Sequence, residues 1–118
     1  MDTPTAFFED LAISLDGWVD ASVSAMTDPA ADLIWTNHPE AFRSLAGVLS
    51  TAELRAALKT ALLEILSGQI HSILVTLDGG TALAEQTLLT VTDEDGHELP
   101  PGLHELFFNH LFETKRFA

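Results

Sequence analysis

Hydrophobic residues recur at helical spacing through the first 49 residues, in two stretches separated by a connection. The stretch from Thr5 to about Met26 combines a wide apolar stripe with acidic residues on the opposite side, which predicts a long amphipathic helix. Residues 28–39 read as a connection that holds a short apolar segment, Leu33-Ile34-Trp35. A short helix is expected over Glu40–Leu49, because Pro39 suits the first position of a helix.

A third helix is predicted to begin after Ser50. The run Ser50-Thr51-Ala52-Glu53 fits a capping box, in which Ser50 caps the helix and Glu53 reaches back to it. The apolar residues that follow repeat every three or four positions, and Gly68 is the expected C-terminal cap. The stripe consists of Leu54, Leu58, Ala61, Leu62, Ile65 and Leu66.

The period of the pattern changes in the second half of the chain. Residues Ile70–Leu77 are rich in β-branched side chains and apolar on both faces, which predicts an inner strand that ends at Asp78-Gly79-Gly80. Thr87–Thr92 alternates like a strand, and the Asp-Gly pair of the turn at 93–96 favours a hairpin that returns over His97–Leu99. The sequence therefore predicts a small, mostly antiparallel sheet.

A last helix is expected from Leu103 to about Thr114. The predicted order is three helices, a strand, a hairpin and a helix, so helices and strands are segregated along the chain. This order indicates an α+β fold, and a length of 118 residues fits one domain over 1–118.

Charge narrows the possible functions. The chain has 18 acids against 5 strong bases and a formal net charge of -13, a surface that repels nucleic acids and anionic membranes. It has no cysteine, which excludes disulfides, thiolate metal sites and a cysteine nucleophile. No signal peptide is visible after Met1, and charges interrupt the apolar runs before they reach the ~20 residues of a membrane span. We expect a soluble cytoplasmic protein.

The acidic residues are unevenly distributed. Residues 1–42 contain eight acids and no strong base, and residues 60–114 contain nine acids and no strong base. An acidic face of this kind steers a basic protein partner, although acidity also serves solubility alone. Two candidate contact surfaces follow. They are Asp10, Asp16 and Asp20 on the first helix, and Asp93, Glu94 and Asp95 in the turn.

Aromatic side chains are more numerous near the C-terminus than one inward stripe requires. Phe108 and Phe112 lie one turn apart, on a different side of the last helix from Phe107 and Leu111. A second apolar face of this kind meets either another element of the same chain or another copy of it. Phe108 and Phe112 are therefore candidate contacts with a partner, including a second copy in a homodimer.

Motifs for catalysis, metals and cofactors are incomplete. The turn at 93–96 lacks the ligand spacing of a calcium loop, and His104-Glu105 lacks the second histidine of a metalloprotease motif. Gly79-Gly80 follows an expected strand but lacks the lysine of a phosphate-binding loop, so it is either a plain turn or a binding loop. No serine lies in a nucleophile elbow. We expect no enzyme activity, no cofactor and no metal.

The second half of the chain resembles small acidic proteins encoded beside toxin genes, including immunity proteins. The resemblance covers about 45 residues and rests on three segments that match an expected strand, hairpin and closing helix. These are residues 72–81, SILVTLDGGT, residues 92–100, TDEDGHELP, and residues 103–107, LHELF. It implies a single-domain inhibitor that binds its toxin without catalysis, and it transfers no functional residue.

These observations favour a non-enzymatic binding protein, an immunity protein or inhibitor that engages a basic protein through its acidic surfaces. The alternatives are a self-associating accessory or scaffold protein, an acidic mimic of DNA, and a small hydrolase that uses His71 or His104.

Overall fold

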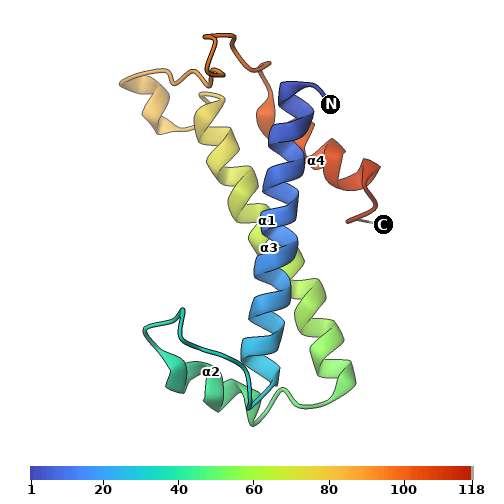
Figure 1. Ribbon diagram of the computed structural model, residues 1–118. Coiled ribbons are helices and arrows are strands. Elements are labelled where there is room, and N and C mark those ends of the chain that lie inside the picture. Colours follow the sequence, from blue (N-terminus) through green and yellow to red (C-terminus); the bar gives the residue numbers. More distant parts are fainter. Residues whose placement is uncertain (118) are drawn as a thin grey trace. The chain divides into compact units, whose positions relative to one another are not determined.

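The computed structural model describes residues 1–117, and helices form most of it (Figure 1). The chain is 63% helical, and no β-strand or sheet occurs in residues 1–117. The predicted α+β fold with an antiparallel sheet is therefore wrong, and the protein is all-helical. Its elements are α1 (Thr3–Thr27), α2 (Pro39–Ala46), α3 (Ala52–Leu77), a short 3₁₀ helix η1 (Ala82–Glu85) and α4 (Leu103–Glu113).

The chain divides into two compact units. The terminal unit combines Met1–Ile13 with Ser67–Ala118, and the central unit is Ser14–Leu66. Both boundaries fall inside the long helices α1 and α3, so each unit contains a part of both helices.

The first two helices agree with the sequence pattern. Asp2 caps α1, since its carboxylate accepts a hydrogen bond of 2.9 Å from the backbone N–H of Thr5. Helix α2 begins at Pro39 as predicted, but it ends at Ala46 instead of Leu49.

Helix α3 departs most from the prediction. Thr51 caps it in place of Ser50, with its hydroxyl oxygen 3.1 Å from the backbone nitrogen of Leu54. The helix then passes through Gly68 and ends at Leu77, so the expected cap at Gly68 and the expected strand over Ile70–Leu77 are both wrong.

Residues 70–77 continue the helix because extending a helix costs less free energy than starting a strand there. Extending an existing helix adds one backbone hydrogen bond for each residue that is ordered, whereas a strand needs a partner strand for its N–H and C=O groups. The β-branched residues lower helix propensity by only about 0.7 kcal/mol or less each relative to alanine. Apolar residues on both faces are also compatible with a helix, because a short apolar run does not distinguish the two structures.

The hairpin region forms its turn without the strands. Thr92 and Glu98 make one isolated antiparallel bridge, and backbone N–H groups of Asp93 and Leu99 bond to His97 and Val91 respectively. Two short strands are marginally stable in water unless further strands or a helix cover them. The predicted strands at 87–92 and 97–99 are therefore wrong, and the turn at 93–96 is present.

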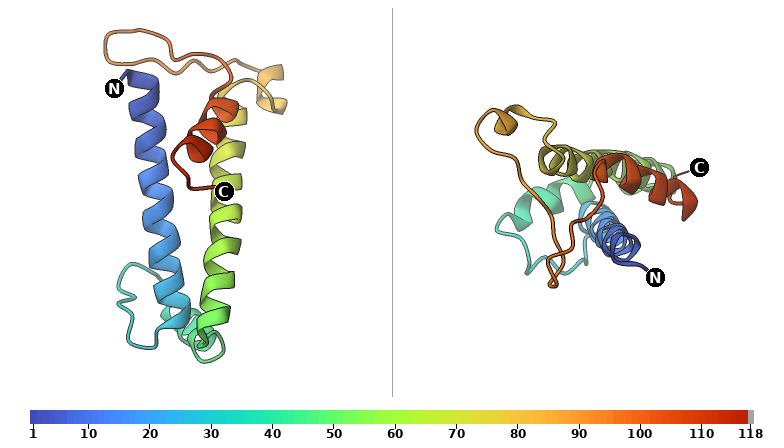
Figure 2. Two further views of the ribbon diagram at one scale, coloured as in Figure 1. Left: turned by 90° about the vertical axis from the view of Figure 1, so that its right-hand side faces the viewer. Right: turned by 90° about the horizontal axis from the view of Figure 1, so that it is seen from above.

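The core of the terminal unit surrounds Phe107 of α4, which is fully buried. The Phe107 ring lies 6.3 Å from the ring of Phe8 in α1, and Phe108 contacts His71 of α3 at 4.8 Å between ring centroids. Helix α4 thus lies beside the first turns of α1 and the last turns of α3 (Figure 2). The other buried apolar residues of this unit are Ala12, Leu74, Leu103 and Leu111.

The central unit has a core of smaller side chains. Its buried apolar residues are Leu15, Val19, Ala25, Leu33 and Ala46, which come from α1, α2 and the loop between them. Trp18 belongs to the apolar stripe of α1 in the sequence, but 53% of its surface is exposed. Trp18 therefore lies largely outside the core of this unit.

Helix α3 combines an apolar sequence with little burial. The segment Ala52–Glu85 is long and apolar enough to cross a membrane by length and composition alone, and only 11% of its most apolar window is buried. Charged residues still interrupt the segment, among them Glu64 and Asp78.

Candidate functional site

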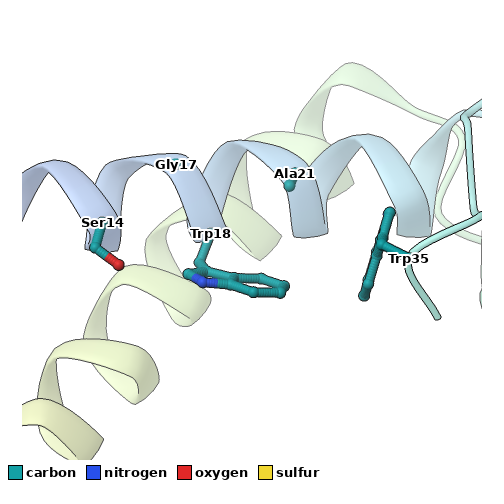
Figure 3. A pocket seen from close by; sticks show the side chains of 5 residues that line it. All are labelled: Ser14, Gly17, Trp18, Ala21 and Trp35. Carbon is teal, nitrogen blue, oxygen red and sulfur yellow. The ribbon is translucent and has the colours of Figure 1, made fainter.

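An open groove lies against one face of α1 in the central unit. Ser14, Gly17, Trp18 and Ala21 follow one another at helical spacing and line the groove, and Trp35 closes it from the loop between α1 and α2 (Figure 3). The groove has a volume of about 320 Å³, and its lining is mostly apolar. The small residues on either side of Trp18 leave the groove open along the helix.

The two tryptophans form a corner. Their ring centroids lie 5.7 Å apart with 81° between the ring planes, so the indole of Trp18 points toward Trp35, whose ring stands across it (Figure 3). Phe42 of α2 contacts the Trp35 ring at 5.2 Å and 64°. Edge-to-face contacts of this kind contribute about 0.5–1.5 kcal/mol for each pair of rings beyond area burial. Trp35 is therefore held between two aromatic neighbours, although 45% of its surface is exposed.

The loop that carries Trp35 is ordered by its own polar groups. The carboxylate of Asp32 accepts a hydrogen bond of 3.1 Å from the backbone N–H of Ile34, and the N–H of Thr36 donates to the carbonyl of Leu33 at 3.2 Å. Leu33 is 7% exposed and anchors the loop in the core. These contacts direct Leu33 inward and leave Trp35 at the groove.

The groove lies in the acidic part of its unit. Residues 14–42 contain five acids and no strong base: Asp16, Asp20, Asp28, Asp32 and Glu40. Each of the three bases of the central unit interacts with its own chain. Arg43 pairs with Glu40 at 2.9 Å, Lys59 lies 3.8 Å from Asp20, and Arg55 donates to the carbonyl of Ser50 at 3.0 Å. The stretch of chain that forms the groove, residues 14–42, therefore carries a net negative formal charge.

The structure separates the acidic residues predicted on the first helix. Asp10 belongs to the terminal unit, and Asp16 and Asp20 belong to the central unit. Asp20 and Lys59 are 72% and 65% exposed, so their ion pair is a weak surface contact. None of the three lines the groove.

The second predicted surface is a tight turn in the terminal unit. The Asp93 carboxylate accepts hydrogen bonds from the backbone N–H groups of Asp95 and His97, each 2.9 Å long, so Asp93 closes the turn. Glu94 and Asp95 are exposed. Single ligand atoms of Asp93, Asp95 and His97 lie within 4.8 Å of one another, a spacing that could hold a metal ion, though the hydrogen bonds already account for this geometry.

The two predicted aromatic contacts have different surroundings. Phe108 packs against His71 and against Phe117 in the C-terminal segment, so it serves the core of its own unit. Phe112 contacts Phe117 at 5.5 Å, but 54% of its surface is exposed. Only Phe112 keeps an open apolar surface.

Two polar clusters in the terminal unit could not be read from the sequence. The first joins Asp78 to α4. The Asp78 carboxylate accepts hydrogen bonds from the backbone N–H groups of Leu103 and His104, at 2.9 and 3.0 Å, and lies 2.5 Å from His104 Nδ1. An ionised carboxylate only accepts hydrogen bonds, so Nδ1 carries the proton. Burial by itself would raise the pKa of Asp78, but these three hydrogen bonds together outweigh it and lower the pKa.

The same cluster contains the two histidines that the hydrolase alternative named. His71 contacts the His104 ring edge to face at 5.2 Å, so His71, His104 and Asp78 do come together. Asp78 nevertheless acts as a cap for α4, since two of its three hydrogen bonds go to the first backbone N–H groups of that helix. Gly79, with φ of +79°, ends α3 as a turn residue.

The second cluster ties α1 to the C-terminal segment. Glu9 Oε2 lies 2.6 Å from His110 Nε2, and Glu9 Oε1 accepts a hydrogen bond of 2.9 Å from Arg116. The hydrogen bonds from Arg116 and His110 lower the pKa of Glu9. These residues are 101 and 107 positions apart from Glu9, so no local sequence signal connects them.

The groove is the candidate site because it exposes apolar and aromatic surface that the core does not use. The sequence placed Trp18 in the inward stripe and Trp35 in a connection, and nothing in the spacing of the two residues shows that their rings meet. Two signals were available: both tryptophans of the chain lie in a stretch without a strong base, and Trp35 belongs to the short apolar segment of the connection. No family model, no curated protein and no solved structure matches this chain.

Proposed function

We propose that this chain is a non-enzymatic, cytoplasmic binding protein that engages a basic protein partner, in the manner of an inhibitor or immunity protein. The observation that carries the proposal is the groove of the central unit, where two half-exposed tryptophans lie within a stretch of five acids and no strong base. Buried aromatic anchors supply most of the affinity of protein interfaces, and tryptophan is among the residues enriched at them.

Charge supports a basic partner over an acidic one. The net charge of -13 attracts a cationic protein before contact and raises its association rate by about 10- to 1000-fold at low salt. The groove would then retain the partner through apolar contact. Steering and anchoring are thus separate steps, and the first is screened by salt while the second is not.

The test is a capture experiment with the immobilised chain and lysate of the source organism, at about 50 mM and about 500 mM salt, because these concentrations span strong and weak screening. We expect the captured protein to be basic and its capture to fall at the higher concentration. A double variant, Trp18→Leu with Trp35→Leu, is the matched control, and we expect it to capture less of the same protein. Each captured protein is then purified, and its association rate is measured against salt.

The proposal fails if capture does not change with salt, if the captured protein is acidic, or if the double variant captures as much as the wild type. Circular dichroism of the double variant shows whether it is folded. The exposure of Trp18 and Trp35, at 53% and 45%, indicates that the fold does not depend on burying either ring completely.

A further inference from the structure

We infer that the groove of Trp18 and Trp35 binds the side chain of an arginine presented by the basic partner. This inference rests on the proposed function and names the group that enters the site.

The ring geometry suits a planar cation. The face of an indole ring carries negative electrostatic potential and attracts guanidinium groups within about 6 Å of its centroid. The 81° between the two rings places two such faces nearly at right angles, so a guanidinium can stack on one ring and turn its edge toward the other. Phe42 supports Trp35 from α2 and limits the rotation of that wall.

The shape of the groove suits the rest of the side chain. An arginine has an apolar stem of three methylenes that prefers an apolar surface, while its head stays charged. Gly17 and Ala21 line the groove beside Trp18, and a methyl group added at Gly17 would meet nothing within 4 Å. The volume of about 320 Å³ accommodates one such side chain.

The charge around the groove selects a cation. No base lines the groove, and the three bases of the central unit interact elsewhere in their own chain. The loop that carries Trp35 also holds Asp28 and Asp32, whose carboxylates accept hydrogen bonds from the backbone N–H groups of Ala30 and Ile34. An arginine fits better than a lysine, because guanidinium is less strongly hydrated than ammonium and stacks on aromatic faces.

The chain provides its own reporter for this site. Trp18 and Trp35 are its only tryptophans and it has no tyrosine, so both indole N–H signals in a ¹H–¹⁵N spectrum belong to the groove. We would titrate the intact protein with N-acetyl-arginine methylamide, with the citrulline analogue, which has the same shape without the charge, and with the lysine analogue.

We expect both indole signals to shift and saturate with the arginine compound. The arginine compound should bind about 2- to 5-fold more tightly than the citrulline compound, which is the range for a cation on a solvent-exposed aromatic face. The lysine compound has the same charge and should bind more weakly than the arginine compound.

Variants locate the binding. Trp18→Leu and Trp35→Leu each keep one indole as a reporter, and each should weaken arginine binding about 2- to 5-fold. Ile34→Ala is the matched control, since Ile34 is in the same loop, is 91% exposed and does not line the groove. It should bind arginine as the wild type does.

Several results would overturn the inference. Equal affinities for arginine and citrulline would show an apolar site, and equal affinities for arginine and lysine would show attraction by net charge alone. Indole shifts that depend on protein concentration without ligand would show that a second copy occupies the groove.

The capture experiment distinguishes a failure of the arginine inference from a failure of the proposed function. If a basic partner is captured in a salt-dependent way and the double variant captures less of it, while the arginine compound does not saturate the indole shifts, the arginine inference is wrong and the proposed function remains. If no basic partner is captured while arginine still saturates the indole shifts, the proposed function is wrong and the arginine site remains.

Discussion

At the scale of single residues, the polar groups that organise this chain lie far apart in the sequence. Asp78 reaches the start of α4, 25 and 26 residues later, and Glu9 meets His110 and Arg116. A carboxylate at a helix N-terminus satisfies backbone donors that have no partner inside the helix. Gly102 precedes α4 with φ of +77° and offers no side chain, so Asp78 supplies the cap from a distance.

We predict that Asp78→Asn destabilises the protein. At pH 7 the free energy of unfolding should fall by about 1–3 kcal/mol, because the variant loses charge-assisted hydrogen bonds at a partly buried site. The side chain of Asp78 is only 9% exposed, so water cannot replace these bonds easily. Urea denaturation measures the change.

The difference in the free energy of unfolding between the wild type and Asp78→Asn should also depend on pH. The pKa of Asp78 is lower in the folded protein than its ordinary value of 3.8, so its contribution is complete above 3.8 and is lost as the pH falls through the folded pKa. The gap between wild type and Asp78→Asn should therefore narrow below pH 3.8. Asp10→Asn removes an exposed carboxylate of the same unit and should change stability by less than about 0.5 kcal/mol. Equal effects of the two variants would contradict the capping role.

At the scale of elements, α3 decides the fold class. The pattern of its first half predicts a helix correctly, whereas the pattern over Ile70–Leu77 predicted a strand and the structure continues the helix through it. Gly68 looks like a terminator because glycine often ends helices, yet here it lies in the interior of a helix of 26 residues. Ser67 next to it is 1% exposed, so this part of α3 is packed on one side.

We predict that Gly68→Ala stabilises the protein. Alanine is favoured over glycine inside a helix by about 0.8–1.0 kcal/mol, and nothing lies within 4 Å of the added methyl group. The matched variant Gly102→Ala should instead destabilise the protein, by about 1 kcal/mol, because a side chain is strained at φ of +77°. The midpoint of urea denaturation should be higher than that of the wild type for Gly68→Ala and lower for Gly102→Ala. If Gly68→Ala were destabilising, the helix would end at Gly68 and residues 70–77 would not continue it.

At the scale of the whole molecule, charge and composition constrain function more than fold. The net charge of -13 holds for any fold of this sequence, and it is the reason for expecting a basic partner. The fold class, by contrast, depends on residues 70–77 of α3 and on residues 87–99, which form one isolated bridge instead of a sheet.

We predict a far-ultraviolet circular dichroism spectrum with minima at about 208 and 222 nm and no β-sheet component, because nearly two-thirds of the chain is helical. An α+β chain of the kind expected from the sequence would give a clearly lower helical signal. A fitted helix content near half the observed 63% would contradict the all-helical structure.

The sequence by itself determined the parts that depend on neighbouring residues. The apolar period predicted α1, α2, the first half of α3 and α4 close to their observed bounds, and the Asp-Gly pair predicted the turn at 93–96. Only the tertiary structure decided whether 70–77 is a helix or a strand, because both satisfy the same apolar pattern and the choice depends on available partners. It also brought Trp18 to Trp35 and Asp78 to α4, since contacts between distant residues leave no trace in local spacing.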